Sequence, residues 1–164
     1  LSQETIERAK ALGMAIGVHS SAGMSSPQSR AGDATRSALL AKQDGPPIRW
    51  YQDMGIPFGL GSDGQVVAHD SPFFTLYWVV SGKDTSGAQY FNHGTLTREE
   101  ALIAHTRSNA YLMHKEDILG SIEVGKLADL AVLSRDYMTI PADEIRDLDA
   151  VLTMVDGRIV YDAM

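Results

Sequence analysis

The hexapeptide GLGSDG (59–64) ends an apolar run in an acid, Asp63, that lies between small residues. The run before it has the composition of a buried strand, and parallel α/β sheets place catalytic groups at the carboxyl ends of their strands. Gly64 would let a backbone or a substrate approach closely, and Ser62 could form a local hydrogen bond. The alternative is a plain turn, because Asp-Gly is a common turn pair. These residues alone leave both interpretations open.

A second candidate, His19, ends another short apolar run, MAIGVHS (14–20). It could bind a metal or contact a substrate, although a lone histidine is more often an ordinary polar residue at a loop junction. The other histidines show no His-x-His or His-Glu-x-x-His spacing; they are His69, His93, His105 and His114. The sequence contains no cysteine, so any metal site must use His, Asp, Glu or a modified Lys.

Charge and composition exclude several classes of partner. Twenty-one acidic residues against 14 basic ones give a net charge of -7, without a basic stripe that would grip a phosphate backbone. Nucleic acid is therefore an unexpected partner. Arg30, Arg36 and Arg49 could meet an anionic substrate, but solvated positions are the default interpretation.

The apolar runs are far shorter than the roughly 20 residues of a membrane span. We expect no transmembrane helix and, with no cysteine present, a reducing, cytoplasmic location. The chain does not start with Met and its first residues are not typical of a signal peptide, so any targeting signal would lie upstream.

Two helix-then-strand units must position the two candidates. The first is a helix over 4–12, capped by Ser2 and ended by Gly13, followed by the strand 14–20. After a Ser- and Gly-rich loop, the second unit has helical patterns over 34–43 and 48–54 and then the strand over 56–62. Both strands are runs without alternation, which is typical of a parallel sheet covered by helices. The spacing indicates either a βα barrel or a doubly wound sheet.

The remainder of the chain changes from helical to β-rich. Pro72 is predicted to begin a helix that is capped by Asp70 or Ser71 and stopped by Gly82. Thr97 and Glu100 form a capping-box pattern ahead of one predicted helix over 98–113. From residue 121 onward the pattern is that of strands, and Asp156-Gly157 is typical of the two-residue turn of a β-hairpin.

The order of four pieces resembles a known family. A strand ending GSD, the helix LTREEALIAHTRSNAYLM, the segment LGSIEVGKLADLAVLSRD and the hairpin VLTMVDGRIVYD are together similar to the C-terminal part of the amidohydrolase superfamily of metal-dependent hydrolases. The phrases SPFFTLYWVVSGK and DYMTIPADEI are similar to its amidohydrolase family three branch, which contains the N-substituted formamide deformylase-like enzymes. The resemblance covers essentially the whole chain and is most specific over 95–161.

The resemblance implies a fold. The chain would be α/β, comprising the last two βα units of a (β/α)8 TIM-like barrel, over residues 1–118, and part of a small composite β-sandwich, over residues 119–164. In that scheme MAIGVHS resembles strand seven and IPFGLGSD resembles strand eight.

The resemblance also implies a chemistry. Asp63 would be the strand-eight aspartate, which binds a divalent metal, with zinc as the expected ion and one or two ions per enzyme, and acts as general base toward the hydrolytic water. The implied reaction is hydrolysis of amide-type, non-peptide C–N bonds of a small-molecule substrate. Ser62 and Gly64 are expected near that substrate. His19 matches no metal-ligand position of the family, since relatives more often have a Gln-Pro pair nearby, which leaves a substrate-side role.

Most of the family's metal ligands have no counterpart in this sequence. The His-x-His of strand one, the carboxylated lysine and the histidines that end strands five and six are missing, so the chain is expected to begin just after the last of these and to be inactive alone. Its expected partner is the N-terminal part of the same protein, with a homo-oligomer also possible. The alternative is a non-catalytic, truncated module that packs or assembles with another chain, because unpaired barrel strands favour association.

Overall fold

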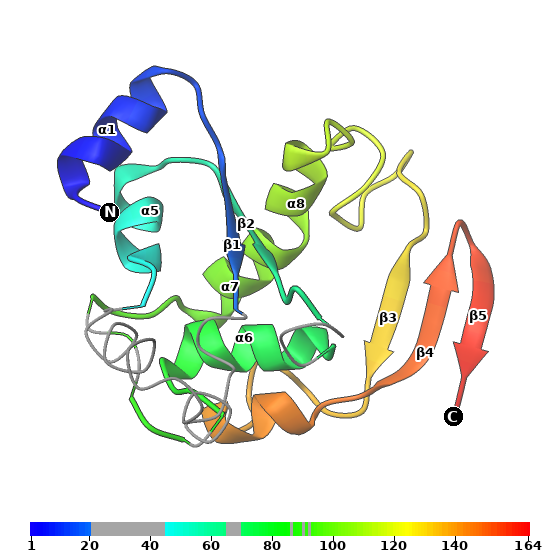
Figure 1. Ribbon diagram of the computed structural model, residues 1–164. Coiled ribbons are helices and arrows are strands. Elements are labelled where there is room, and N and C mark those ends of the chain that lie inside the picture. The colour runs from blue at the N-terminus through cyan, green and yellow to red at the C-terminus, as the bar shows by residue number, and fades with distance from the viewer. Residues whose placement is uncertain (21–44, 65–69, 86, 90, 92) are drawn as a thin grey trace.

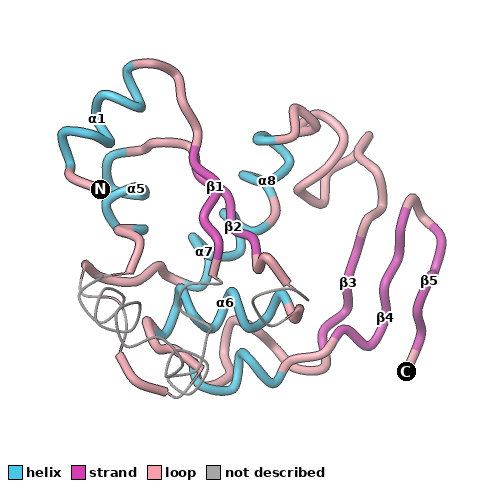
Figure 2. Tube along the Cα trace, in the orientation of Figure 1, coloured by secondary structure: helices cyan, strands magenta, loops and turns pink. Residues whose placement is uncertain are grey.

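The computed structural model describes residues 1–20, 45–64, 70–85, 87–89, 91 and 93–164 of the chain. The described part is mixed α/β: helices surround a two-stranded parallel sheet, and a three-stranded antiparallel sheet follows (Figures 1 and 2). The loop after residue 20, the helix predicted over 34–43 and His69 lie outside the described residues. Within these ranges, no helix is both long and apolar enough to cross a membrane.

The first half of the chain confirms the predicted helix-then-strand units where they are described. Helix α1 (Gln3–Ala11) begins after Ser2, whose side chain accepts a hydrogen bond from the Thr5 amide, and it ends before Gly13 at φ +71°. Strand β1 (Ile16–His19) follows. Helix α5 (Ile48–Met54) ends at Gly55 in the left-handed conformation, and strand β2 (Phe58–Gly61) comes next. Each of these boundaries rests on a cap or a glycine that acts locally.

Strands β1 and β2 pair in parallel, with Ile16 opposite Phe58 and His19 opposite Gly61. Residues opposite each other share a face, so this sheet has one apolar face and one face of glycines with His19. The apolar face carries Ile16, Val18, Phe58 and Leu60. The prediction that both strands are fully buried was wrong for β1, in which burial alternates: Val18 is buried, whereas Gly17 and His19 are exposed. The reason is that His19 and the glycines leave only one apolar face on this strand.

Three helices follow the sheet. Helix α6 (Pro72–Ser81) begins with Pro72 after Ser71 and ends at Gly82 in the left-handed conformation, as predicted. The single helix predicted over 98–113 was wrong: it is divided into α7 (Arg98–His105) and α8 (Arg107–Leu112). The break lies at Thr106, where φ is −118° and ψ is −79° and the hydroxyl donates to the Leu102 carbonyl at 2.7 Å. Threonine that bonds back to the preceding turn bends helices, which accounts for the division.

The C-terminal part contains an antiparallel sheet in the order β3-β4-β5 and a short 3₁₀ helix, η1. Their bounds are β3 (Leu130–Leu133), η1 (Ala142–Asp147), β4 (Ala150–Val155) and β5 (Arg158–Asp162). The hairpin turn is confirmed: Asp156 and Gly157 have φ of +50° and +73°, as the mirror-image turn between twisted strands requires.

One hydrophobic core joins most of these elements. Trp78 and Tyr77 of α6 are fully buried at its centre, and Ile145 and Leu148 bring the η1 segment into the same cluster. The β3-β4-β5 sheet lies to one side of the helices (Figure 1). The proposed boundary between residues 118 and 119 stays a prediction.

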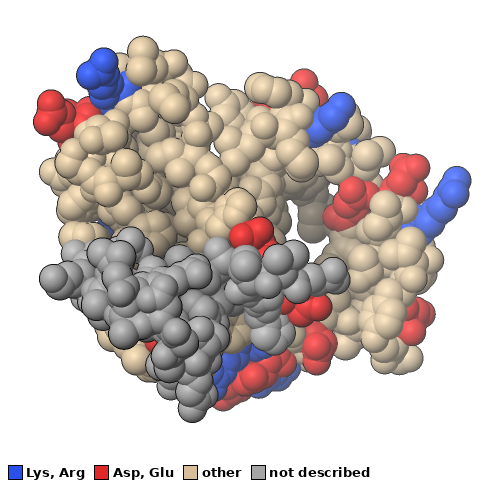
Figure 3. Space-filling view, viewed as in Figure 1, with Lys and Arg blue, Asp and Glu red and all other residues tan. Residues whose placement is uncertain are grey.

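On the face shown in Figure 3, basic side chains stand among acidic ones over the described elements. This distribution accords with the excess of acidic residues in the sequence.

Candidate functional site

The carboxyl ends of β1 and β2 bring Asp63 and His19 together. Because the strands are parallel and in register at His19 and Gly61, the residues that follow them emerge at one edge of the sheet. The Asp63 Oδ2 atom lies 3.9 Å from His19 Nδ1. Both side chains are accessible, with 49% of Asp63 and 58% of His19 exposed. The two residues are 44 positions apart in the sequence, and only the parallel pairing makes them neighbours.

Asp63 adopts an unusual backbone conformation. Its φ is +57°, in the left-handed region that L-residues other than Gly, Asn and Asp seldom visit. The residues before and after Asp63 are joined by a hydrogen bond, in which the Gly64 amide donates to the Ser62 hydroxyl oxygen at 3.1 Å. A Cβ at Gly64 would lie 2.9 Å from the Asp70 Cα, so that position must be glycine. Ser62 and Gly64, predicted near a substrate, therefore both shape the turn that carries Asp63.

A buried polar contact fixes the strand ends beneath this pair. The Ser20 amide donates to the Gly61 carbonyl at 3.0 Å, which extends the strand pairing by one residue. The Ser20 hydroxyl lies 3.1 Å from the Thr75 hydroxyl in α6, and both residues are completely buried. Sequence reasoning missed this contact; the available signal was a hydroxyl residue, Thr75, inside the most apolar helix.

Helix α8 supports β2 from the glycine face. The Asn109 side chain donates to the Leu60 carbonyl at 2.9 Å and to the His105 carbonyl at 3.0 Å. A Cβ at Gly59 would lie 2.1 Å from Asn109 Oδ1 and 2.6 Å from Leu112 Cδ1. The absence of a side chain at Gly59 is thus what allows α8 to lie against the strand that delivers Asp63.

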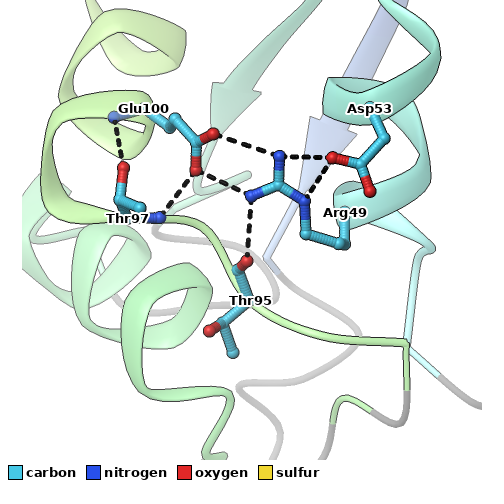
Figure 4. A network of polar contacts seen from close by, with 5 residues as sticks. All are labelled: Arg49, Asp53, Thr95, Thr97 and Glu100. Atoms are coloured by element: carbon cyan, nitrogen blue, oxygen red, sulfur yellow. Dashed lines mark hydrogen bonds and ion pairs between the residues drawn. The ribbon is translucent and has the colours of Figure 1, made fainter.

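An ion-pair network holds α5 against the start of α7 (Figure 4). The Arg49 guanidinium donates to both carboxylate oxygens of Glu100, at 2.8 and 3.1 Å, and its Nε donates to Asp53 at 2.8 Å. The hydrogen bonds from Arg49 lower the pKa of Glu100 and raise that of Arg49. The default interpretation that Arg49 is solvated is therefore wrong, because Glu100 and Asp53 pair with its charge. Arg30 and Arg36 lie outside the described residues.

His105 lies at the end of α7, and its burial lowers its pKa and favours the neutral ring.

The donor types at the Asp63 edge suit a divalent metal, but the described residues do not complete a site. Zinc accepts carboxylate oxygen and imidazole nitrogen, and Asp63 and His19 offer one of each. No group of three or more His, Cys, Asp or Glu side chains able to hold a metal occurs within the described ranges. A catalytic zinc takes three protein ligands. Asp63 therefore fits as one ligand of a site that needs further ligands.

Comparisons with known proteins connect the whole chain to one family. The sequence model described as the amidohydrolase family matches residues 1–161. The N-substituted formamide deformylase of Arthrobacter pascens is 33% identical over 116 residues, which cover 71% of this chain and 21% of that protein.

Solved structures share the fold. A crystal structure of atrazine chlorohydrolase from Arthrobacter aurescens TC1, complexed with zinc, matches 99% of this chain and 34% of that one, with a TM-score of 0.69 at 21% identity. An adenosine deaminase from Xanthomonas campestris with bound zinc matches 99% of this chain and 35% of that one, with a TM-score of 0.68 at 17% identity. The present chain thus spans about a fifth of the deformylase and about a third of each of these two chains.

Proposed function

This chain belongs to the amidohydrolase family, and from that premise we propose that the polypeptide containing it is a metal-dependent hydrolase of C–N bonds other than peptide bonds. The observation that carries the proposal is the place of Asp63, at the carboxyl edge of two parallel strands in a chain that matches the family over residues 1–161. Catalytic residues of βα barrels lie at that edge.

We place β1 and β2 as strands seven and eight of a (β/α)8 barrel and the β3-β4-β5 sheet as part of a small β-sandwich. Two features support this placement. The strands are adjacent and parallel, with α5 in the segment between them, as successive βα units of a barrel must be. Solved structures that match 99% of the chain support the placement at the level of the fold. Residues 1–118 and 119–164 are then the barrel portion and the sandwich portion.

In the proposed mechanism Asp63 has two roles. Its carboxylate would hold the metal through oxygen, accept the proton of the attacking water and deliver that proton to the leaving nitrogen. When bound, a divalent ion, with zinc as the expected ion, would supply Lewis acidity at this edge. Neither strand end blocks the carboxylate, because about half of the Asp63 side chain is exposed. The further ligands come from the part of the polypeptide outside this chain, so the 164 residues alone are inactive.

The proposed substrate is a small molecule with an amide-type bond. The name of the deformylase that is 33% identical makes N-substituted formamides the first compounds to test. His19 is placed on the substrate side of Asp63, because it projects at the same edge and is exposed. Its ring can donate or accept one hydrogen bond there.

Turnover by the full-length protein tests the proposal. The wild type, loaded with zinc, is compared with Asp63→Asn across N-substituted formamides and other small amides. Asparagine keeps the size of the side chain but is not a base. Loss of a general base typically lowers kcat by about 10²- to 10⁴-fold, and we expect a fall of about 10³-fold or more here. Asp156→Asn is the matched control, because Asp156 is also an exposed aspartate in the left-handed conformation, at φ +50°, in a remote hairpin. Equal turnover of Asp63→Asn and the wild type would overturn the proposal.

A second candidate function is that of a non-catalytic module that packs against another chain. The observation that favours it is the exposed apolar surface of the hairpin, where Ile159, Val160 and Tyr161 are each more than half exposed. Large exposed apolar surfaces mark sites of association. The mass and zinc content of the purified 164-residue chain test it: a defined oligomer without zinc would favour this candidate, and a monomer that binds zinc tightly would contradict it.

A further inference from the structure

We infer that Ser62 is a positioning residue, which holds Asp63 in its left-handed conformation and so directs the Asp63 carboxylate toward the reacting edge. The inference rests on the proposed role of Asp63. It replaces the simpler expectation that Ser62 contacts the substrate.

A hydrogen bond closes the turn that contains Asp63. The Ser62 hydroxyl oxygen accepts the Gly64 amide at 3.1 Å, so the two residues that flank Asp63 are joined by a hydrogen bond around it. Within this closed turn Asp63 has φ +57°, and its Oδ2 faces His19 at 3.9 Å. A Cβ at Gly64 would lie 2.9 Å from the Asp70 Cα and 3.0 Å from the Ser62 hydroxyl oxygen, so the turn is closely packed at this position.

A comparison within the chain shows why this turn needs a side chain to hold it. Asp156 has nearly the same φ, +50°, but paired strands on both sides fix its turn. The pairing of β1 with β2 ends at Gly61, two residues before Asp63. The Ser62 hydroxyl supplies a restraint at the position where this pairing has ended.

The conformation matters because φ sets the direction of the Cα–Cβ bond. A relaxed Asp63 with negative φ would point its carboxylate away from the position it now shares with His19. Residues that orient metal ligands without touching the metal affect affinity by 10–100-fold when they are lost. We therefore expect the Ser62 hydroxyl to contribute to metal binding and to kcat through the direction of Asp63.

The test uses the full-length protein and measures zinc affinity by competition with a chromogenic chelator, alongside kcat and KM. Ser62→Ala removes the acceptor, whereas Ser62→Thr keeps it. Ser62→Val matches Ser62→Thr in shape without the hydroxyl, so the comparison of Val with Thr decides the question even if Ser62→Ala folds poorly. Ser81→Ala is the control for loss of a similar bond, because the Ser81 hydroxyl accepts the Lys83 amide two residues on, also at 3.1 Å.

We expect Ser62→Ala and Ser62→Val to weaken zinc binding by about 10-fold or more and to lower kcat more than they raise KM. Ser62→Thr should stay within about threefold of the wild type, as should Ser81→Ala. A substrate contact at Ser62 would instead raise KM and leave zinc affinity unchanged, which would overturn the inference.

Asp63→Asn, measured in the same assays, distinguishes a failure of the role of Ser62 from a failure of the proposed function. If Asp63→Asn loses zinc and turnover while Ser62→Ala and Ser62→Val keep both, the positioning role is wrong and the proposed function stands. If Asp63→Asn keeps both, the proposed function fails and the role of Ser62 fails with it.

Discussion

Around the site, glycines that allow close packing matter as much as the residues with polar side chains. Gly17 and Gly59 are opposite each other on the same face of the β1–β2 sheet, yet their surroundings differ. Among the described residues, a Cβ at Gly17 would meet only His19 Nε2, at 4.0 Å, whereas one at Gly59 would collide with Asn109 and Leu112 of α8. The second glycine is therefore required by helix packing and the first is not.

Gly59→Ala should lower the free energy of unfolding by about 1–3 kcal/mol, the usual cost of an added methyl in a packed interface. Gly17→Ala, the matched control, should change it by less than about 0.5 kcal/mol. Chemical unfolding of the full-length protein, followed by tryptophan fluorescence, measures both. Equal effects of the two variants would mean that α8 does not lie against Gly59 in solution.

Glu100 and His105 make stability depend on pH in the same direction, and the exposed Glu123, whose pKa is lowered by the Ser121 hydroxyl, acts in that direction too. Hydrogen bonds from Arg49 lower the pKa of Glu100 below its ordinary 4.5, and burial lowers the pKa of His105 below 6.5. In both cases the unfolded chain binds more protons than the folded one at pH values near and below the ordinary pKa, so stability rises with pH through those windows. The stabilisation that these groups provide is complete above about pH 6.5 and declines as the pH falls.

We predict a first loss of stability as the pH falls below 6.5, from His105, and a second below 4.5, from Glu100 and Glu123. Glu100→Gln should reduce the second loss and leave the first in place, because the variant has no charge opposite Arg49 at any pH. Unfolding free energies measured from about pH 2 to pH 8 in the wild type and the variant test this. A variant with an unchanged second step would show that the Arg49–Glu100 pair does not form.

At the scale of elements, helix ends could be predicted from the sequence because their signals are local. The helix-end signals at Ser2, Gly13, Gly82 and the Thr97–Glu100 pair lie where they were expected. The break at Thr106 could not be predicted, because no Gly or Pro marks it and it depends on a side chain bonding to its own helix.

Contacts between distant segments were also hidden from the sequence. Arg49 meets Glu100 across 51 positions, and Ser20 meets Thr75 across 55. For the site, the strand end that carries Asp63 could be predicted from its apolar run, whereas the proximity of His19 required the parallel register of the sheet.

The capping box of α7 allows a direct test. The Thr97 side chain accepts the Glu100 amide at 3.2 Å, and Glu100 accepts the Thr97 amide at 2.8 Å. Thr97→Ala should reduce the free energy of unfolding by about 1 kcal/mol, the typical cost of a lost N-cap. Thr97→Ser keeps the acceptor and should cost much less. A Thr97→Ala protein as stable as the wild type would indicate that α7 does not depend on this cap.

At the scale of the molecule, polar contacts reinforce the core packing that joins the C-terminal part to the helices. Arg98, the first residue of α7, donates to the carbonyls of Tyr137 and Ile140, and the Tyr137 hydroxyl donates back to the Arg98 carbonyl at 3.0 Å. Burial raises the pKa of Tyr137 to about 12, so this hydroxyl stays protonated at physiological pH. These contacts hold the segment that leads into η1 against the start of α7, in addition to the core packing of Ile145 and Leu148.

Arg98→Ala should loosen residues 134–148 and leave α1 and β1 unchanged. Hydrogen exchange followed by mass spectrometry measures this, with at least about tenfold faster exchange expected in peptides from 134–148, equivalent to about 1.4 kcal/mol of local stability. Arg158→Ala, in the exposed strand β5, is the control. Equal protection in the two variants would show that Arg98 is not the attachment point.

The central claim is that Asp63 binds a catalytic metal in the complete protein. Anomalous diffraction at the zinc edge, from crystals of the full-length protein grown with zinc, tests it most directly. The account predicts a zinc peak about 2.0–2.2 Å from an Asp63 carboxylate oxygen, the normal zinc–oxygen distance. A zinc ion fully bound by other residues, with Asp63 more than about 4 Å away from it, would contradict the account.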